Sequence, residues 1–587
     1  MKKLIIVMAF MVANLTNAQS SKMGSEVAKY GNVSPETVFV HYNSSLFLSG
    51  EYLYYKVYCL QASEKYSRLS KIAYVELIGE DGQVVFKHRI SLNKGIGQGD
   101  FFIPTSVPSG NYKLVAYTQW MRNEGSSVFF KGDVTIVNPY RADQRAFLEV
   151  SSGSETDIKI DEESPQKITE SRGYKEFELR LDKGRLYKNR QEVTLSFKNF
   201  IREKGLGHYS LSVRKTDALP RVDRPTSNAY KPHTTGQGRS INSSSFQPES
   251  KGYIISGKVL ETASGQPAAN ESVAVSIGGE DFIFKATTTN ALGAFQFAID
   301  VPTQEDRAVV QVLSDRRDLF TIQLDQQKEI DHSNLEFLSY AMTPSMKAVL
   351  EQRSVNNQIE NGYYSIKPDT LIPLATEKPF MYYENHLRYD LKDYTRFSTM
   401  EEVFTEIVDR VWTATDTNGK RIVKVFHKKT TLPNQDYPLI FIDGHFVQDP
   451  QELLDYNALQ VQKVNVVQNQ YQFGNKEYQG IIMIETVDAN HESMLNGDHM
   501  KSVALFKPQR EKLYYRQVYR AVTSETDKRI PDYRSQLLWE PSITLEGSEV
   551  RFQFYTSDNA GEYEISLEGF TMEGKPVSLK EYITVED

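Results

Sequence analysis

Between residues 36 and 137, apolar and polar residues alternate in short runs, which is the pattern of β-strands with one buried face. Segments rich in Gly, Asn, Asp and Pro separate these runs and are typical of turns. The runs cover residues 38–42, 52–60, 72–79, 84–92, 112–120 and 134–137. Short strands at this spacing predict an antiparallel β-sandwich over residues 36–140.

Similar alternation recurs further along the chain. Runs at 177–181, 192–197 and 209–215 predict a second β-sandwich over residues 174–218. Residues 219–250 hold few large apolar side chains and many Pro, Ser, Thr, Asn and Gly, so they predict a flexible linker or a long loop. Strand patterns then predict two more sandwiches, over residues 251–316 and 500–587.

A helical pattern appears after residue 334, and we expect a helical connector over residues 334–395. Thr343 can cap a helix that has Pro344 at its first position, which is a favoured placement. Apolar side chains then share one face of this helix; they are Met346, Val349 and Leu350.

A second helix is predicted to follow Ser398 and Glu401, which form an S-x-x-E capping box. Its apolar face spans about three turns and comprises Met400, Val403, Phe404, Ile407, Val408 and Val411. Buried strands follow at 422–427, 438–444, 461–468 and 480–486. Together they predict a small α/β domain over residues 396–488, with Asp443-Gly444 as a turn. The expected fold class is therefore mainly β, with tandem immunoglobulin-like or prealbumin-like β-sandwiches and one small α/β domain.

Composition narrows the classes of function. The chain has 587 residues, of which 40% are hydrophobic, 11% aromatic and 25% charged. This length suggests roughly four domains of ordinary size. The net charge is −8, and no basic run of five or more residues occurs. Nucleic acid is therefore not an expected partner.

The first residues predict an exported protein. Lys2-Lys3 precede a short apolar run over 4–12, and Ala18 is a small residue before Gln19. This pattern predicts a signal peptide over residues 1–18. The apolar run is shorter than the roughly 20 residues that span a bilayer, and no later run is long enough. We therefore expect a protein that is peripheral to a membrane rather than spanning it.

Cys59 is the only cysteine, so no internal disulfide and no cysteine metal site is expected. An exported chain that avoids cysteine suits a bacterial periplasm or cell surface. The expected localisation is the periplasm or the outer membrane, and the cell surface is a further option.

The first sandwich resembles a known domain. Residues 47–51 read Phe-Leu-Ser-Gly-Glu, residues 108–112 read Pro-Ser-Gly-Asn-Tyr, and residues 116–123 read Ala-Tyr-Thr-Gln-Trp-Met-Arg-Asn. These three segments resemble the MG2-type domain of the α2-macroglobulin family in bacterial envelope proteins. Such domains often carry an Asp-Lys pair where this chain has Asn43-Ser44, so a role for that pair is not expected here.

Two further segments resemble known domains. The order of strand, turn, strand and Thr289-Asn290 through Gly293 to Phe297 is similar to the carboxypeptidase regulatory-like domain, which is a prealbumin-like, non-catalytic sandwich. Residues 532–534, 538–541 and 552–569 resemble the closing sandwich of macroglobulin-related envelope proteins.

The α/β domain resembles the plug of TonB-dependent outer-membrane receptors. The match lies in the strand and turn over 438–444, in the strand over 461–467 and in residues 480–484, which read Gly-Ile-Ile-Met-Ile. A receptor of this kind also has a 22-stranded barrel, which needs over about 200 residues. Only 97 residues follow residue 490, so we expect a plug-like domain without that barrel.

Motifs of catalysis and metal binding are missing. Cys59-Leu60-Gln61-Ala62 is not the C-G-E-Q thioester run of protease-trapping macroglobulins, and neither H-E-x-x-H nor G-x-S-x-G occurs. The glycine-rich residues 95–99 are expected to form a loop between strands, because phosphate binding of that kind needs a following helix. The acidic pairs Glu80-Asp81 and Asp558 with Glu562 could bind calcium, but hairpin turns are the better expectation. We predict no catalytic residue, no cofactor and no metal site.

Two functions remain open. The first is a non-catalytic envelope protein that acts by protein–protein contacts, as an accessory subunit of an outer-membrane transport, secretion or assembly complex. Its expected partner is an outer-membrane β-barrel protein or complex. The alternative is a cell-surface glycan- or substrate-binding protein, which a cluster of exposed Tyr and Trp side chains in a groove would favour.

Overall fold

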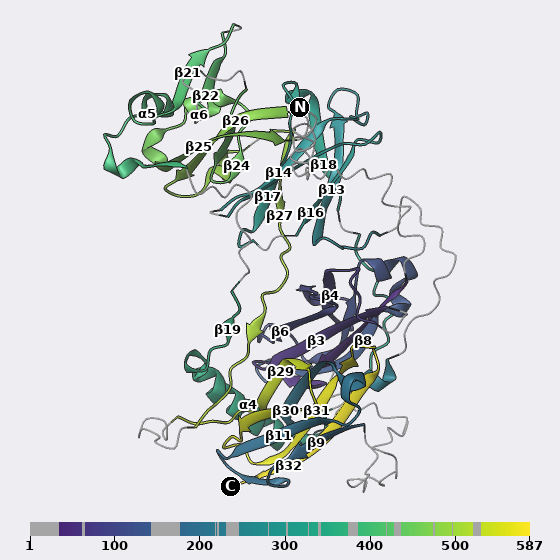
Figure 1. Ribbon diagram of the computed structural model, residues 1–587. Coiled ribbons are helices and arrows are strands. Elements are labelled where there is room, and N and C mark those ends of the chain that lie inside the picture. Colours follow the sequence, from purple (N-terminus) through teal and green to yellow (C-terminus); the bar gives the residue numbers. More distant parts are fainter. Residues whose placement is uncertain are drawn as a thin grey trace, which may run out of the picture. The chain divides into compact units, whose positions relative to one another are not determined.

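The computed structural model describes residues 34–61, 65–141, 176–217, 219, 222–230, 246–279, 281–300, 303–326, 328–338, 342–373, 386–417, 419–427, 436–473, 476–495, 497–519 and 530–587. The predicted signal peptide over 1–18 lies outside these residues. The described chain is mainly β, which confirms the predicted fold class (Figure 1). None of its helices is both long and apolar enough to cross a bilayer.

Internal contacts divide the chain into two compact units. Unit 1 contains residues 251–328 and 374–507, and unit 2 contains residues 31–250, 329–373 and 508–587. Each unit is assembled from segments that lie far apart in the sequence.

The first sandwich of unit 2 pairs a three-stranded sheet with a five-stranded sheet. The three-stranded sheet has the order β1 (Glu36–Tyr42), β3 (Tyr52–Gln61), β6 (Ile96–Phe102). The five-stranded sheet has the order β2 (Leu46–Leu48), β8 (Phe130–Val137), β7 (Gly110–Tyr117), β4 (Ile72–Gly79), β5 (Val84–Ser91). Large apolar side chains between the sheets, such as Val57, Leu77 and Leu114, are fully buried.

The glycine-rich run 95–99 is a correction to the expected loop, because β6 begins at Ile96. Gly99 pairs with Tyr55 of β3. A Cβ atom at Gly99 would lie 2.4 Å from the Tyr55 hydroxyl oxygen, which is too close for any larger residue. The glycine therefore leaves room for a neighbouring side chain inside a strand.

The second sandwich of unit 2 combines two distant segments. Its three-stranded sheet has the order β30 (Glu549–Tyr555), β11 (Glu192–Asn199), β9 (Phe177–Leu181). Its five-stranded sheet has the order β10 (Leu186–Lys188), β32 (Pro576–Glu586), β31 (Gly561–Thr571), β12 (Gly207–Lys215), β29 (Gln536–Leu545). Leu195, Leu211 and Leu567 belong to one shared core.

Residues 174–218 and 500–587, which the sequence analysis treated as separate sandwiches, thus contribute to a single one. Neither segment alone has enough strands to close a core between two sheets. Alternation identifies the buried face of a strand, but it does not identify the partner strand.

Unit 1 contains another sandwich of two sheets. One has the order β16 (Ala294–Ile299), β13 (Tyr253–Glu261), β18 (Phe320–Leu324), and the other has the order β15 (Ile283–Thr288), β14 (Ser272–Ile277), β17 (Arg307–Val312), β27 (Met500–Ala504). The strand β27 comes from the segment expected to belong to the C-terminal sandwich and pairs antiparallel with β17. The sandwich expected over 251–316 therefore also includes β18, which follows residue 316, and β27, which follows the α/β domain in the sequence.

The expected α/β domain is present in unit 1 as a mixed sheet with helices on one face. The sheet has the order β20 (Leu387–Asp390), β25 (Val461–Phe473), β26 (Lys476–Thr486), β23 (Leu439–Ile442), β24 (His445–Phe446). The remaining elements are α5 (Met400–Glu406), the hairpin β21 (Val411–Thr415) and β22 (Arg421–Val425), and α6 (Pro450–Leu454). The helix-side core includes Phe404, Leu453 and Ile482.

The other face of this sheet packs on the sandwich of unit 1. Leu439, Phe441 and Ile481 share a core cluster with Phe282 and Phe284 of the sandwich. The ring centroids of Phe441 and Phe282 lie 4.8 Å apart. Both faces of the sheet are therefore covered, which its continuous apolar strands require.

Asp443-Gly444 forms the predicted turn between β23 and β24. Both residues have positive φ, at 50° and 79°, as a two-residue hairpin turn of this kind requires. The Asp443 carboxylate also accepts hydrogen bonds from the Thr486 backbone N–H at 2.7 Å and from its hydroxyl at 2.6 Å. A Cβ atom at Gly444 would lie 2.4 Å from the Cβ of Phe282. Glycine is therefore needed both for the turn and for the close contact with the sandwich.

The helix starts differ slightly from the predictions. The capping box of α5 is formed by Thr399 and Glu402, one residue after the predicted pair Ser398 and Glu401. The helix ends at Glu406, and Val411 begins β21. Most of the predicted buried positions are confirmed, since Met400, Val403, Phe404, Val408 and Val411 are buried and Ile407 is partly buried against the same core.

The helix α4 (Lys347–Gly362) lies in unit 2. Its N-cap is Met346 rather than the predicted Thr343, because Pro344 starts a 3₁₀ turn before the α-helix. Met346 packs in a cluster with Val349 and Leu350, as predicted, and Leu46 and Leu219 belong to the same cluster.

Described parts of residues 219–250 pack against the sandwiches of unit 2 and do not form a flexible linker. The Ser227 backbone N–H donates to the Glu568 carboxylate at 2.8 Å, and the Ser227 hydroxyl donates to the Val577 carbonyl at 2.8 Å. The Tyr74 hydroxyl donates to the Glu249 carboxylate at 3.0 Å. These contacts are polar, and an argument from apolar content does not detect them.

Candidate functional site

A cavity of about 160 Å³ lies in unit 2 where α4 and the residues after it meet both sandwiches. We call it the tyrosine cavity. Its walls come from β3, α4, β29, the residues 364–369 and the pair Tyr514-Tyr515. Helix α4 approaches the first sandwich through asparagines four residues apart, which share one helix face. The Asn357 and Asn361 side-chain amides donate to the carbonyls of Ser49 and Gly50, each at 3.0 Å.

Aromatic rings form one side of the cavity. Tyr52 and Tyr54 lie two positions apart on β3, so their side chains leave the same face of the strand, and their stacked rings have centroids 5.6 Å apart. The Tyr54 ring is 5.0 Å from Tyr514 and 5.9 Å from Trp539, again between centroids. Tyr364 stacks on Tyr52 at 6.1 Å and is 42% exposed. The cluster therefore extends from the cavity to the surface.

Asn43 holds the backbone of these tyrosines. Its side-chain oxygen accepts a hydrogen bond from the Tyr54 N–H at 2.9 Å, and its amide nitrogen donates to the Tyr52 carbonyl at 3.2 Å. The same nitrogen donates to the Gln536 side chain on β29 at 3.0 Å. Asn43 thus positions the cavity wall formed by Tyr52 and Tyr54.

A buried group of ion pairs forms a second side. Glu51 pairs with Arg353 of α4 at 2.7 Å and with Arg214 of β12 at 2.9 Å, and Arg353 also pairs with Asp217 at 2.6 Å. Burial by itself would raise the pKa of Glu51, but Arg353 and Arg214 outweigh it and hold the pKa at about 2. These charges are therefore fully engaged with one another.

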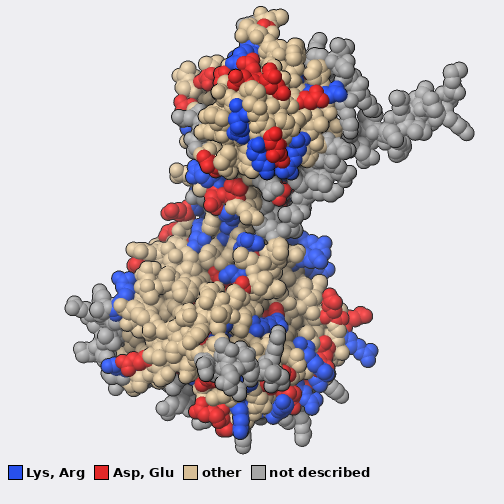
Figure 2. Space-filling model, turned by 90° about the vertical axis from the view of Figure 1, so that its left-hand side faces the viewer, with Lys and Arg blue, Asp and Glu red and all other residues tan. Residues whose placement is uncertain are grey.

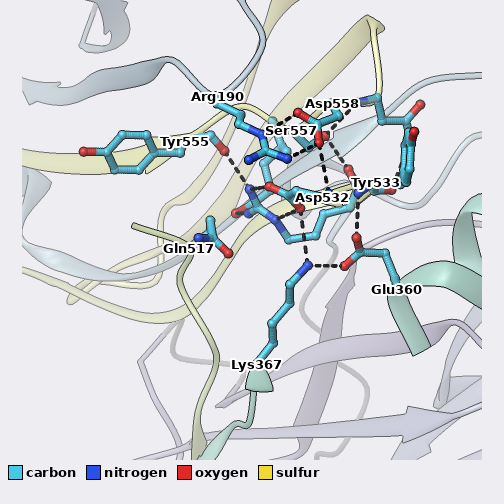
Figure 3. Close-up of polar contacts among 12 residues, drawn as sticks. Arg190, Glu360, Lys367, Gln517, Asp532, Tyr533, Tyr555, Ser557 and Asp558 are labelled. Carbon is cyan, nitrogen blue, oxygen red and sulfur yellow. Dashed lines mark hydrogen bonds and ion pairs between the residues drawn. The ribbon is translucent and has the colours of Figure 1, made fainter. Parts of the chain in front are cut away.

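A third side carries the contacts shown in Figure 3. Lys367 lies between Glu360 of α4, at 2.7 Å, and Asp532, at 3.6 Å. Arg534 binds the two oxygens of Asp532 at 2.6 and 2.7 Å. Burial would raise the pKa of Asp532, but Arg534 and Lys367 lower it to about 2. Asp532 is therefore ionised and paired in the folded protein.

The carboxylate of Asp369 differs from these pairs. Its Oδ1 accepts a hydrogen bond from the Tyr515 backbone N–H at 2.9 Å. Among the described residues, no Lys, Arg or His forms an ion pair with it. Burial raises the pKa of Asp369 and outweighs the Tyr515 hydrogen bond and the charge of Lys512, which both lower this pKa, while Asp100 adds to the rise. Asp369 is thus a half-buried acceptor beside the tyrosine rings.

The stretch of chain between Arg353 and Lys367, which forms part of the cavity wall, carries few charges. Between Arg353 and Lys367, Glu360 is the only charged residue of the sequence. Figure 2 shows a broad area of uncharged side chains in its lower half, with Lys and Arg interspersed with Asp and Glu elsewhere on the displayed face.

The acidic pairs considered for calcium are used in other contacts. The Asp81 carboxylate accepts the Gln83 N–H at 3.0 Å within the turn between β4 and β5. The carboxylate of Asp558 binds Arg190 at 2.6 Å, so it belongs to an ion pair (Figure 3). Over the part of the chain that the structure describes, no cluster of three or more His, Cys, Asp or Glu is arranged to hold a metal.

The residues of the tyrosine cavity were not predicted from the sequence. They come from segments around 52, 360 and 535 that only folding brings together. One local signal was available, since the run over 354–366, in which Glu360 is the only charged residue, contains three asparagines and two adjacent tyrosines. A packed helix face seldom needs so many amides, so this run could have indicated a polar site.

Comparison with known proteins identifies structural neighbours at a low level. No protein-family model matches the chain, and no curated protein matches it. Among solved structures, Escherichia coli α2-macroglobulin activated by porcine elastase is 9% identical at a TM-score of 0.24, over 94% of this chain and 44% of that one. Salmonella α2-macroglobulin reacted with methylamine is 10% identical at a TM-score of 0.23, over 97% of this chain and 40% of that one. The chain spans less than half the length of these proteins, and likenesses at this level assign it no activity or partner.

Proposed function

We propose that this chain is a non-catalytic, glycan-binding protein of the cell envelope and that the tyrosine cavity is its binding site. The observation that carries this proposal is the cluster of Tyr52, Tyr54, Tyr364 and Trp539 beside a polar cavity. Sugar rings offer apolar faces that pack on aromatic rings, and their hydroxyls need hydrogen-bond partners. A cavity with both features suits such a ligand.

The volume of the cavity limits the size of the ligand that it can hold. At about 160 Å³ it is smaller than the roughly 300–1,000 Å³ of sites for drug-sized molecules. It accommodates one terminal sugar unit rather than a whole oligosaccharide. Further units would contact the rim, where Tyr364 and Phe102 are each about two-fifths exposed and both approach the Tyr52 ring.

A matched pair of variants tests this proposal. Tyr364→Ala removes a ring of the cavity, whereas Tyr363→Ala removes a neighbouring ring that does not line it. We expect a glycan array to reveal ligands of the wild-type protein and calorimetry to show at least about five-fold weaker binding for Tyr364→Ala, since losing one stacking contact costs roughly 1 kcal/mol or more. Tyr363→Ala should bind like the wild type. Equal affinity of both variants would contradict the proposed site.

A second candidate function is the accessory subunit of an outer-membrane complex. It rests on the resemblance of residues 396–488 to a receptor plug and on exposed apolar side chains of unit 1. Leu459 and Val487 are 56% and 61% exposed, and they are neighbours, because the Val487 N–H donates to the Gln460 carbonyl at 2.8 Å. Exposed apolar side chains of this kind favour protein contacts.

Pull-down in mild detergent tests this second function. Under it, the wild-type protein co-purifies with an outer-membrane β-barrel protein, and the double variant Leu459→Ser/Val487→Ser loses that partner. Recovery of the wild-type protein alone would count against an accessory role. Both functions place the chain outside the cytoplasm, in the periplasm, at the outer membrane or on the cell surface, without catalytic activity.

A further inference from the structure

The charges of the tyrosine cavity balance except at one residue. Arg214 and Arg353 are neutralised by Glu51 and Asp217, and Lys367 and Arg534 are neutralised by Glu360 and Asp532. Asp369 also lines the cavity. Its carboxylate receives one backbone hydrogen bond and no ion pair from the described residues. The cavity therefore carries an uncompensated negative charge.

The charged groups nearest Asp369 do not supply the missing cation. Lys512 of β28 (Lys512–Leu513) pairs with Asp100 of β6 at 2.8 Å. Asp100 also accepts a hydrogen bond from the Tyr514 hydroxyl at 3.2 Å. The charge of Lys512 also lowers the pKa of Asp369, but Lys512 and Asp100 neutralise one another as a pair. The carboxylate left to attract a positive ligand group is that of Asp369.

Tyrosine rings line the same cavity as Asp369. The negative charge of Asp369 contributes to raising the pKa of the Tyr54 hydroxyl after burial, which is the larger cause. It also raises the pKa of Tyr52, after the larger effects of burial, Tyr364 and Asp100. Asp369, Tyr52 and Tyr54 all line the same cavity. Faces of tyrosine rings attract cations by about 0.5–2 kcal/mol, and more strongly where water is excluded.

We propose that the cavity selects a ligand bearing an ammonium group, held between Asp369 and the rings of Tyr52 and Tyr54. The inference rests on the proposed glycan-binding function and narrows its ligand class to glycans with a free amino group, such as a de-N-acetylated amino sugar. The ammonium group supplies N–H donors to the Asp369 carboxylate, and the sugar ring packs on Tyr364 and Tyr52. Acetylation removes the charge and most of these donors.

Calorimetry with three soluble oligosaccharides tests the proposal: a glucosamine oligomer, the matching N-acetylglucosamine oligomer and a neutral glucose oligomer. The wild-type protein is expected to bind the glucosamine oligomer at least about ten-fold more tightly than the other two, since an ion pair in a partly buried site contributes more than about 1 kcal/mol. This preference should weaken with added salt. The Asp369→Asn variant should lose the preference and keep the weaker binding of the neutral oligomer.

The control variant is Glu573→Gln, which removes an exposed carboxylate of unit 2 in the turn between β31 and β32. It should keep the full preference. Equal binding of the charged and neutral oligomers would overturn this inference and leave the proposed function standing. Failure of every glycan to bind would overturn both. Tighter binding of a lysine peptide than of the glucosamine oligomer would overturn the amino-sugar assignment and indicate a protein ligand for Asp369.

Discussion

In unit 1 the mixed sheet of the α/β domain meets the sandwich through aromatic and aliphatic side chains, whereas in unit 2 helix α4 meets the sandwiches through arginines, carboxylates and asparagines. The first contact is closed, with Phe441 and Phe284 fully or almost fully buried. The second contact leaves a cavity lined by tyrosines.

The difference has a physical meaning. Apolar side chains fill space and gain free energy from leaving water. Buried charges pay a large desolvation cost, so a buried ion-pair network is weak evidence for stability alone. Helix α4 is therefore a better candidate for a functional contact than the face of the mixed sheet.

The largest effect is expected from Phe441→Ala in unit 1. Phe441 is fully buried, and such truncation costs about 3–5 kcal/mol through lost burial and a cavity. Urea unfolding should show this loss, and hydrogen exchange should accelerate in β14, β23 and β26 but not in unit 2. The exposed Trp412 of the same unit is the control, and Trp412→Ala should change stability little. Unchanged exchange in β14 would mean that the sheet and the sandwich do not stabilise each other.

Arg353→Met should destabilise unit 2 by about 3 kcal/mol, because Asp217 and part of Glu51 lose their partner in a buried site. Hydrogen exchange in α4 and β3 should accelerate while unit 1 stays protected. The control is Lys347→Met at the exposed start of α4, which pairs only with exposed Glu351. If both variants behave alike, the buried network does not hold α4.

Lowering the pH should weaken the contact between α4 and the sandwiches of unit 2, because the carboxylates of this contact become protonated. The folded pKa of Glu51 is about 2, below the ordinary value of 4.5, so the unfolded chain binds more protons between these values. Its contribution is present above about pH 4.5 and is lost as the pH falls towards 2. Urea midpoints of the wild type should fall across this window, and Glu51→Gln should flatten the fall. If the urea midpoint falls equally with pH in the wild type and in Glu51→Gln, the ion pairs of Glu51 with Arg353 and Arg214 are contradicted.

The smallest effect is expected for Asn43→Ala, at about 1–2 kcal/mol of stability, since buried hydrogen-bonding groups on Tyr52 and Tyr54 lose their partner. Glycan binding should weaken as well, because the cavity wall loses its support. Ser44→Ala, which removes only a local contact with Leu46, is the control. Calorimetry and thermal unfolding measured together distinguish a lost site from a lost fold.

Several elements of the fold were predictable because their signals are local. The alternation over 72–79 marks β4, the apolar positions after 400 mark the buried face of α5, and Asp443-Gly444 marks a turn. The capping box was placed one residue early, since Ser398 and Thr399 can both serve as caps and only the packed helix selects Thr399.

The partners of strands far apart in sequence were not predictable in the same way. Alternation cannot tell that β12 lies between β29 and β31, or that β27 joins the sandwich of residues 253–324. The tyrosine cavity depends on these pairings, because β29 brings Trp539 next to Tyr54 of β3. A site formed by three distant segments leaves no contiguous motif.

The sequence by itself determined a mainly β chain, the approximate strands and helices, and the turn at Asp443-Gly444, because each depends on the periodicity or conformational preference of a few neighbouring residues. Only the tertiary structure decided which strands share a sheet, how the second sandwich closes and where charges remain unpaired. Asp369 is the clearest example. The sequence shows that this residue is an aspartate. Whether its carboxylate has an ion-pair partner depends on the fold, which pairs the nearby lysines with other carboxylates.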